Sequence, residues 1–354
     1  MEPYFLLLIF VIVLILFQDI YGGVRLSFFG KKYDIIPFIT YVVFLLFYSL
    51  RDNIGYDYGM YCQIIEKGYA DDVYASKGEY ISAGLLDIAN YFNDPHLYFF
   101  LTAAISLACI IYACYKYIKI DSGLGWGMLV FLSLPLGLIY TLATQRQFVA
   151  IGFMMLSIGY LQQRKIFKFT GITFLATMAH ISTCFCWFLY VIQSKFINKK
   201  MLVLLGAAGI VVISQLVSII AFFFPFYMVY IEQATGSSIG GVTQFILYGL
   251  IFLVSLGLYY FVKEKQIYDF FLKNYTFGFF LMAMLFPFDA NISFRLGGFA
   301  LLNAIFLIPM WVTAFSGISK IIFKIALIAA LSFVYYYGLI TTVDDFYLPY
   351  KTFL

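Results

Sequence analysis

The chain has 354 residues, of which 64% are apolar and only 11% are charged, with a formal net charge of +4. Its mean hydropathy of +0.94 is far above that of a soluble domain, which excludes a water-soluble enzyme or a nucleic-acid-binding module. Apolar runs of about 20 residues recur along the chain, as a bilayer core of roughly 30 Å requires. Because only helices satisfy the backbone within such runs, we predict an all-α polytopic membrane protein.

The apolar runs, taken in chain order, predict about twelve transmembrane helices. The first run has no basic leader and no small-residue cleavage site, so we expect a retained helix. The apolar stretch 167–193 is continuous. It could form two short helices, one long helix or a re-entrant pair, and the sequence leaves these alternatives open. The runs lie near 3–18, 35–50, 97–115, 124–141, 147–161, 167–180, 181–193, 202–224, 243–262, 275–289, 296–314 and 319–340.

The longest predicted loop runs from about 51 to 96. It contains the sequence YISAGLLDIANYF, in which Ile81, Leu85, Ile88 and Phe92 recur at helical spacing. This pattern predicts a short helix lying along the membrane surface. We therefore expect a single transmembrane domain, 1–354, with one long outer loop.

The distribution of basic residues predicts the orientation, because positively charged loops stay in the cytoplasm. Most of the 22 basic residues fall on one side of the predicted spans: Arg25, Lys31, Lys32, Lys116, Lys119, Arg164, Lys165, Lys168, Lys195, Lys199, Lys200, Lys263, Lys265, Lys273, Lys320 and Lys324. The others are Arg51, Lys67, Lys77, Arg146, Arg295 and Lys351, on a side that holds most of the acids. Both termini are then predicted to lie outside. This alternation favours a break within 167–193, since one merged helix would invert every later loop.

Three arginines stand at the predicted outer ends of apolar spans: Arg51, Arg146 and Arg295. An arginine costs about 2.5–3.5 kcal/mol at the bilayer centre and less near the interface, so a charge at such a position indicates function. Interfacial anchoring is the alternative for any one of them. Anchoring explains three arginines together less well, because they lie on the side of the membrane where basic residues are rare. An anionic ligand is therefore the favoured explanation. Because the planar guanidinium binds phosphate oxygens in two places, we predict a membrane-embedded phosphate group.

Candidate proton acceptors lie beside these arginines in the predicted topology. They are Asp52 and Asp57 after the second span, Glu79 in the long loop, and His180 at the outer end of the sixth span. Histidine is the usual acid or base near neutral pH. A local ion pair is the alternative for Asp52, and a satisfied interfacial histidine is the alternative for His180.

Aromatic residues also gather on the predicted outer side, in GYDYGMY, FFFPFYMVY and DDFYLPY. Aromatic faces with polar edges line binding sites for amphipathic ligands such as sugars. The acid pairs Asp71–Asp72 and Asp344–Asp345 provide oxygen ligands of the kind that divalent cations prefer, but adjacent acids are common in solvated loops. No nucleotide-binding, nucleophile-elbow or zinc-binding motif is present, and we expect neither a metal nor a cofactor.

Several motifs in order resemble one family. RDNIGYDYGMY is followed by GEYISAGLL, TQRQFVAIGFMMLSIGYLQQRK, FLATMAHIS, ISFRLGGFA and LPYK. This series resembles the EpsG-type family of bacterial polysaccharide polymerases, related to the Wzy O-antigen polymerases, and it extends from Arg51 to Lys351. The motif residues are Arg51, Gly55, Asp57, Tyr61, Glu79, Arg146, Gln147, His180 and Arg295.

The resemblance implies a glycosyltransferase with a GT-C-like architecture in the bacterial cytoplasmic membrane, with its active site facing outward. Such a polymerase joins undecaprenyl-diphosphate-linked oligosaccharide repeat units into O-antigen or exopolysaccharide, by an inverting or a retaining course. Its partners would be the lipid-linked donor and acceptor and a chain-length regulator in the membrane, with no nucleic acid. The implied catalytic residues are Asp57, His180 and Glu79, and the implied binding residues are Arg51, Arg146, Arg295, Gln147 and Tyr61.

Three other functions stay open on the sequence, one of them an O-acyltransferase, whose acyl donor would be reached from the cytoplasmic side. A flippase or other transporter of lipid-linked oligosaccharides is the non-enzymatic alternative, although transporters commonly carry their unusual residues near the midplane of the membrane. An O-antigen ligase would use the same donor with a different acceptor. Transfer from a diphosphate requires neutralisation of the departing phosphates and a base for the attacking hydroxyl, and the predicted outer face supplies both.

Overall fold

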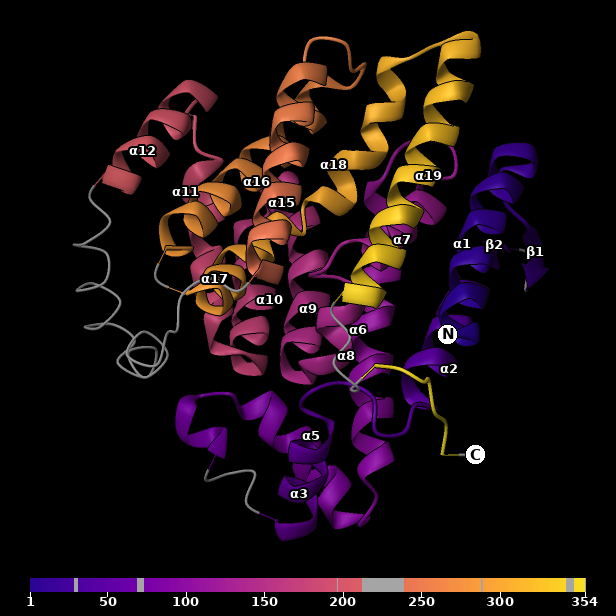
Figure 1. Cartoon of the computed structure of the whole chain (residues 1–354), viewed down its shortest axis with the longest axis vertical. Coiled ribbons are helices and arrows are strands. Elements are labelled where there is room, and N and C mark those ends of the chain that lie inside the picture. The colour runs from indigo at the N-terminus through magenta and orange to yellow at the C-terminus, as the bar shows by residue number, and fades with distance from the viewer. Residues whose placement is uncertain are drawn as a thin grey trace. The chain divides into compact units, whose positions relative to one another are not determined.

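The structure is a computed structural model that describes residues 1–28, 31–68, 73–195, 197–211, 239–287, 289–341 and 347–353. The chain forms two compact units, one of Met1–Cys184 with Ile321–Leu354 and the other of Phe185–Lys320. Nearly every described element is a helix (Figure 1), which confirms the predicted helical class. A short antiparallel hairpin of β1 (Arg25–Phe28) and β2 (Lys31–Asp34) is the exception.

The helices of the first unit follow the predicted spans closely. They are α1 (Glu2–Tyr21), α2 (Ile36–Ser49), α3 (Tyr58–Lys67), α5 (Tyr80–Tyr91), α6 (Pro95–Tyr117), α7 (Gly123–Ser133), α8 (Leu138–Ala143), α9 (Gln145–Gln162), α10 (Ile166–Ala179) and most of α19 (Gly317–Thr341), with the short 3₁₀ helix η1 (Ala75–Lys77). The predicted span 124–141 is interrupted, since α7 ends before Pro135 and α8 starts at Leu138. Proline lacks the backbone donor that a helix interior needs, which explains this interruption.

The elements of the second unit are shorter on average. They are η2 (Ile181–Trp187), whose first residues belong to the first unit, α11 (Phe188–Ile192), α12 (Lys199–Val211), α15 (Ile239–Leu258), α16 (Lys265–Leu285), α17 (Ala290–Leu301), α18 (Ala304–Trp311) and η4 (Val312–Ala314). Leu281, Leu285, Ile292 and Leu296 form a buried cluster where α16 packs against α17. The end of the predicted span 202–224 and the cluster FFFPFYMVY lie outside the described residues.

Four of the described helices are long and apolar enough to cross a membrane: α1, α6, α19 and, over Gly241–Leu258, α15. A fifth span is possible by these criteria if α17 and the segment Ala304–Ala314, which meet at 57°, count as one. Helices α2, α7 and α10 are apolar but shorter. Length and composition thus support a membrane protein, and the full number of about twelve spans stays a prediction.

Helix α19 packs antiparallel to α1 within the first unit. The Tyr335 hydroxyl donates to the carbonyl oxygen of Tyr4 at 3.0 Å, and the Lys324 ammonium pairs with Asp19 at 2.6 Å, toward the other end of α1. After α19, residues 347–353 return to the end of α2 (Figure 1). Residues 347–353 therefore lie beside Arg51, which follows α2.

The long loop between α2 and α6 is largely helical, because it contains α3, η1 and α5. The helix predicted over YISAGLLDIANYF is confirmed as α5, and its position along the membrane surface stays a prediction. Leu85 is buried, whereas Ile88 and Phe92 are 45% and 64% exposed. Ser82 is buried instead, since its hydroxyl donates to the Ala179 carbonyl at 2.7 Å and holds α5 against the end of α10.

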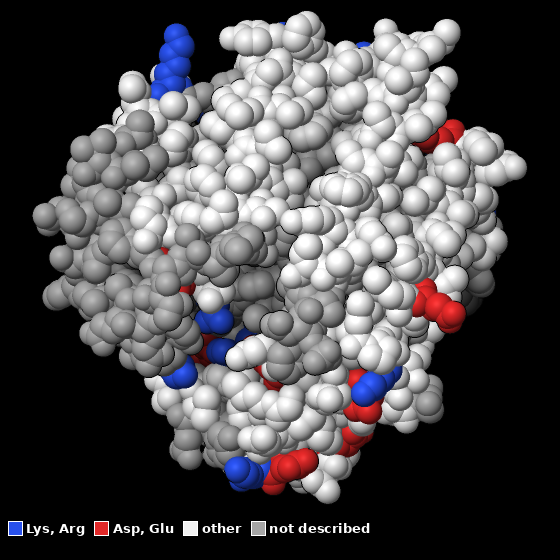
Figure 2. All heavy atoms as spheres, in the orientation of Figure 1, with Lys and Arg blue, Asp and Glu red and all other residues white. Residues whose placement is uncertain are grey.

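Gly55 fixes the start of this loop against α8. Its φ of +104° is one that other residues rarely adopt, and a Cβ at this position would lie 2.3 Å from the carbonyl oxygen of Leu142. Charged side chains on the face drawn in Figure 2 gather around α3 and α5, while uncharged residues cover most of the remaining described surface. The loop is thus a folded layer that carries charge.

Candidate functional site

Glu79 is held by a tight turn at the start of α5. The η1 turn ends at Gly78, whose φ of +81° reverses the chain. The Glu79 N–H then donates to the carbonyl oxygen of Tyr74 at 3.0 Å. Only 1% of Glu79 is exposed, so its carboxylate requires partners inside the protein.

His180 provides the first of these partners. Helix α10 ends at Ala179, and His180 has an extended backbone, so its side chain leaves the helix direction. Its Nδ1 lies 2.8 Å from Oε1 of Glu79, and the backbone N–H of Ile181 donates to the same oxygen at 3.1 Å. The break predicted within 167–193 is therefore the feature that brings His180 to Glu79.

Arg146 provides the second partner. It lies in the first turn of α9, immediately after the break at Thr144 that separates α8 from α9. Its guanidinium donates to Oε2 of Glu79 and lies over the ring of Tyr74, 4.1 Å from the ring centroid. Both carboxylate oxygens of Glu79 are thus occupied by donors.

Gln147 completes the chain of contacts on the far side of His180. Its Nε2 lies 2.7 Å from Nε2 of His180, and its Oε1 is buried without a hydrogen-bond partner among the described residues. With this amide orientation, the Nδ1–H of His180 donates to Glu79 and its Nε2 accepts from Gln147. The basic nitrogen of His180 therefore faces away from the carboxylate, as in other carboxylate–histidine pairs.

Glu79, which belongs to the predicted outer loop, remains ionised in this network. Burial by itself raises the pKa of Glu79, but the hydrogen bond and charge of His180, the charge of Arg146 and the N–H of Ile181 lower it to about 2. A carboxylate that is so weakly basic is a poor general base. Glu79 is suited instead to holding His180 in one tautomer and to neutralising Arg146.

Asp57 and Tyr61 lie next to this network. Asp57 is half-buried and immediately precedes α3, while Tyr61 is buried in α3 and interacts electrostatically with Arg146. The charge of Asp57 acts on both Tyr61 and Tyr74. Five of the predicted site residues therefore gather close to Glu79: His180, Arg146, Gln147, Tyr61 and Asp57.

Arg51 belongs to a separate cluster in the same unit. It is fully buried at the end of α2, and its guanidinium lies 5.0 Å from the centroid of Phe99. The ring of Phe99 also contacts that of Tyr61, with centroids 6.4 Å apart. Arg51 is thus near the Glu79 network without bonding to it.

Arg295 lies in the second unit, on α17, and is half-buried. The N-cap of that helix is Asp289, whose side chain accepts from the Ile292 N–H at 2.7 Å. The predicted convergence of Arg295 with the other two arginines stays a prediction.

Sequence reasoning missed Tyr74, which lies against Arg146. The chain has 31 tyrosines, and nothing in the sequence around Tyr74 distinguishes it from the others. No group of three or more His, Cys, Asp or Glu side chains that could hold a metal occurs among the described residues. The acid pairs Asp71–Asp72 and Asp344–Asp345 lie outside that part of the chain.

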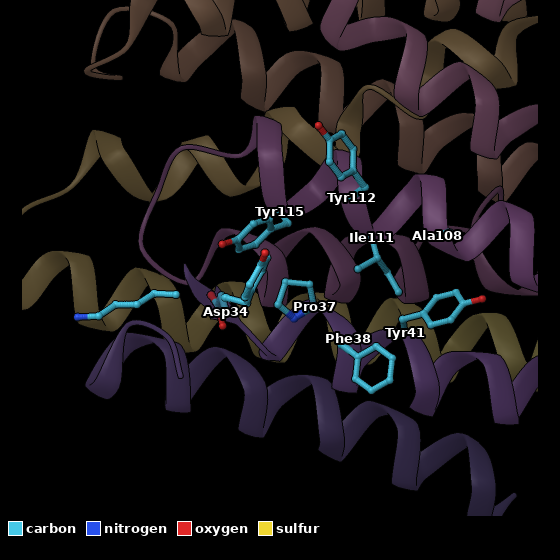
Figure 3. A pocket seen from close by; sticks show the side chains of 10 residues that line it. Asp34, Pro37, Phe38, Tyr41, Ala108, Ile111, Tyr112 and Tyr115 are labelled. Carbon is cyan, nitrogen blue, oxygen red and sulfur yellow. The ribbon is translucent and has the colours of Figure 1, made fainter. Parts of the chain in front are cut away.

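A pocket of about 470 Å³ lies elsewhere in the first unit, where β2 and α2 face α6 (Figure 3). Its lining is aromatic and aliphatic except for Lys32 and Asp34. None of the predicted site residues lines it, and the Asp34 carboxylate accepts from the Ile36 N–H at 3.1 Å. The pocket is therefore not part of the candidate site.

The model of the EpsG family matches residues 34–352, a range that contains every residue of the Glu79 network and Arg51. A search of curated proteins and a search of solved structures found no match.

Proposed function

Because the chain belongs to the EpsG family, we propose that it is a polysaccharide polymerase of the bacterial cytoplasmic membrane. It joins undecaprenyl-diphosphate-linked oligosaccharide repeat units into a surface polysaccharide at the outer face, with a GT-C-like architecture. The reaction is a glycosyl transfer. A hydroxyl of the acceptor repeat attacks the first sugar of the donor chain, and the bond from that sugar to the diphosphate breaks.

The contact between Glu79 and His180 is the observation that carries this proposal. A buried carboxylate that bonds Nδ1 leaves Nε2 of His180 as the basic atom, and it stabilises the imidazolium that forms when Nε2 takes a proton. Gln147 occupies Nε2 in the free protein, so its amide must turn aside when the acceptor hydroxyl binds. His180 then acts as the general base, a role worth roughly 10²–10⁴-fold in rate.

Arginines supply the positive charge for the departing diphosphate. The charge of Arg146 is largely balanced by Glu79, so Arg146 positions the carboxylate and contributes less to phosphate binding. Arg51 and Arg295 are the candidates for direct binding, because a guanidinium holds phosphate oxygens in two places. Tyr61 and Asp57 are the candidates for contacts with sugar hydroxyls, since Tyr61 interacts with Arg146 and Asp57 with Tyr61 and Tyr74.

A transporter of lipid-linked oligosaccharides is the second candidate, and one observation favours it. The pair α17 and Ala304–Ala314 is bent by 57° at Asn303, and discontinuous helices are common at transport sites. Asn303 is buried there and its Oδ1 accepts from the side-chain amide of Asn274 at 3.1 Å. An O-antigen ligase remains the enzymatic alternative.

The experiment uses purified full-length protein in micelles with a synthetic lipid-diphosphate-linked repeat unit as both donor and acceptor. Formation of dimers and longer chains supports the polymerase, and His180→Ala is expected to abolish it. Product attached only to an added lipid A core would support the ligase. Absence of any product, combined with movement of the same lipid across the bilayer of proteoliposomes, would support the transporter.

A further inference from the structure

Arg51 has an unusual environment for a permanently charged side chain. Its residue is fully buried, and Nε and both terminal nitrogens lack a hydrogen-bond partner among the described residues. The guanidinium lies over the face of the Phe99 ring, 5.0 Å from its centroid. A buried charge without hydrogen bonds is strongly unfavourable, so a guanidinium in this position requires an anion.

The hydroxyl groups around Arg51 do not supply that anion. Tyr4 donates to the carbonyl oxygen of Tyr347 at 2.9 Å, and Tyr58 donates to the Asp52 carboxylate at 3.3 Å. Tyr48 shares a hydrogen bond of 2.7 Å with Thr141. The five N–H donors of the guanidinium therefore lie among tyrosine rings whose hydroxyl groups are hydrogen-bonded to other residues.

The C-terminal segment 347–353 covers this site, and we call it the strap. Its backbone pairs with the chain on either side of Arg51: the Asp52 N–H donates to Lys351 at 3.0 Å and the Phe353 N–H donates to Leu50 at 3.3 Å. The ring of Phe353 stacks on that of His96, with centroids 3.9 Å apart. The Arg51 charge also lies close enough to Tyr350 to oppose the effect of burial, which raises the pKa of that tyrosine to about 12.

Side chains add two more hydrogen bonds, from the Tyr4 hydroxyl to the Tyr347 carbonyl and from the Tyr350 hydroxyl to the Phe47 carbonyl. Opening of the strap therefore requires these bonds and the backbone pair to break together, as a local unfolding step. When the strap lifts, Tyr4 loses its acceptor on Tyr347. Its hydroxyl then becomes a donor beside the Arg51 guanidinium. The opened site would thus hold two kinds of donor suited to phosphate oxygens.

We infer that Arg51 is the centre of an anion-binding site that takes a diphosphate group, and that the strap of residues 347–353 is the lid of this site. The inference deepens the proposed function and rests on it, since the diphosphate is that of the lipid-linked substrate. The motif LPYK then has a role, because it contains most of the lid.

The first test is thermal unfolding of the full-length protein in micelles, with inorganic pyrophosphate or glucuronate added at equal ionic strength. Pyrophosphate is expected to raise the Tm of the wild type by an amount that grows with the logarithm of its concentration. Arg51→Met is expected to lose this shift, while its Tm without ligand is equal to or above that of the wild type, because an unpaired buried charge has been removed. Lys67→Met, at an exposed lysine of α3, serves as the control and retains the shift.

Two outcomes of this test would overturn the inference. The first is a Tm of Arg51→Met well below that of the wild type together with no effect of pyrophosphate on the wild type, which would make Arg51 a structural residue. The second is a shift with glucuronate but not with pyrophosphate, which would assign the site to a sugar carboxylate. Polymer formation that depends on His180 would keep the proposed function in either case. A normal pyrophosphate shift with unimpaired polymer in Arg51→Met would instead contradict the role of Arg51 in the reaction.

The second test measures the lid directly. Arg51→Cys, in a Cys62→Ser background, is labelled with a membrane-impermeant maleimide only when the strap opens. Phe353→Pro removes the hydrogen bond to Leu50 and the stack on His96, and is expected to raise the labelling rate about tenfold. Lys351→Ala keeps both contacts and should leave the rate unchanged. Equal labelling rates in all three proteins would overturn the lid.

Discussion

Oε1 of Glu79 and Nδ1 of His180 lie 2.8 Å apart, although 101 positions separate the two residues in the chain. One comes from the turn before α5 and the other from the end of α10. The serine hydroxyl of Ser82 ties the same two elements together. The contact therefore results from how the outer loop folds onto α10, and its chemistry depends on that fold.

Glu79→Gln and His180→Ala are each expected to abolish polymer at an unchanged protein level. Glutamine keeps the shape of Glu79 but cannot stabilise an imidazolium, and alanine removes the base. The measurement is the amount of long-chain glycan per unit of protein in membranes. Glu66→Gln, at an exposed glutamate of α3, is the matched control and should have no effect.

Asp57→Asn separates the two candidate bases. If His180 is the base, this variant is expected to reduce activity by weakening sugar contacts and to keep the pH profile of the wild type. Loss of activity at every pH, equal to that of His180→Ala, would move the role of base to Asp57. Normal long-chain glycan in Glu79→Gln, His180→Ala and Asp57→Asn would contradict the whole catalytic assignment.

Gly55→Ala is expected to destabilise the protein severely. The new Cβ would lie 2.3 Å from the Leu142 carbonyl oxygen, and the φ of +104° is strained for alanine. Gly59 is the matched control, because a Cβ there meets nothing within 4 Å and alanine favours the helix by about 0.5–1 kcal/mol. The measurement is the Tm of each variant in micelles. Equal Tm values for the two alanine variants would show that the loop does not depend on its contact with α8.

Several parts of this arrangement were predictable from the sequence, and others were not. Local signals located His180 at a chain break and Arg146 at a helix start, because apolar length and charge determine where such helices end. The contact of Arg146 with Glu79 spans 67 positions and has no local signal. The burial of Ser82 likewise has no local signal: this side chain is polar, yet it is buried because the Ala179 carbonyl accepts its hydrogen bond. Burial of polar groups depends on distant partners, which a periodic pattern does not report.

Acid is expected to remove the stabilisation that Glu79 provides. Its folded-state pKa of about 2 is below the ordinary glutamate value of about 4.3, so its contribution of about 3 kcal/mol is complete above pH 4.3 and is lost as the pH falls toward 2. The measurement is the free energy of unfolding of the wild type and of Glu79→Gln between pH 7 and pH 2.5. The difference between the two proteins should shrink over the acid part of this range, and a constant difference would contradict the depressed pKa.

The orientation of the loop gives an independent prediction. Single cysteines at Tyr91, which is 83% exposed on α5, and at Phe167, which is 90% exposed on α10, should react with a membrane-impermeant reagent from opposite sides of the membrane. Tyr91→Cys should be labelled in intact cells and Phe167→Cys only after the membrane is opened. The reverse pattern would place the Glu79 network on the cytoplasmic side and exclude transfer at the outer face.

Substitution of the arginines by lysine separates a polymerase from a transporter. Lysine keeps the charge but loses the planar fork that binds two phosphate oxygens, so Arg51→Lys, Arg146→Lys and Arg295→Lys are each expected to lower polymer yield far more than Lys67→Arg or Lys77→Arg. Arg146→Lys has a second cause of loss, because it weakens the bond to Glu79. The measurement is a gel of surface glycan from cells carrying each variant. Export precedes polymerisation in the proposed scheme, so the arginine variants should display single repeat units without a ladder. Absence of even the single repeat, with precursor accumulating on the cytoplasmic leaflet, would favour the transporter.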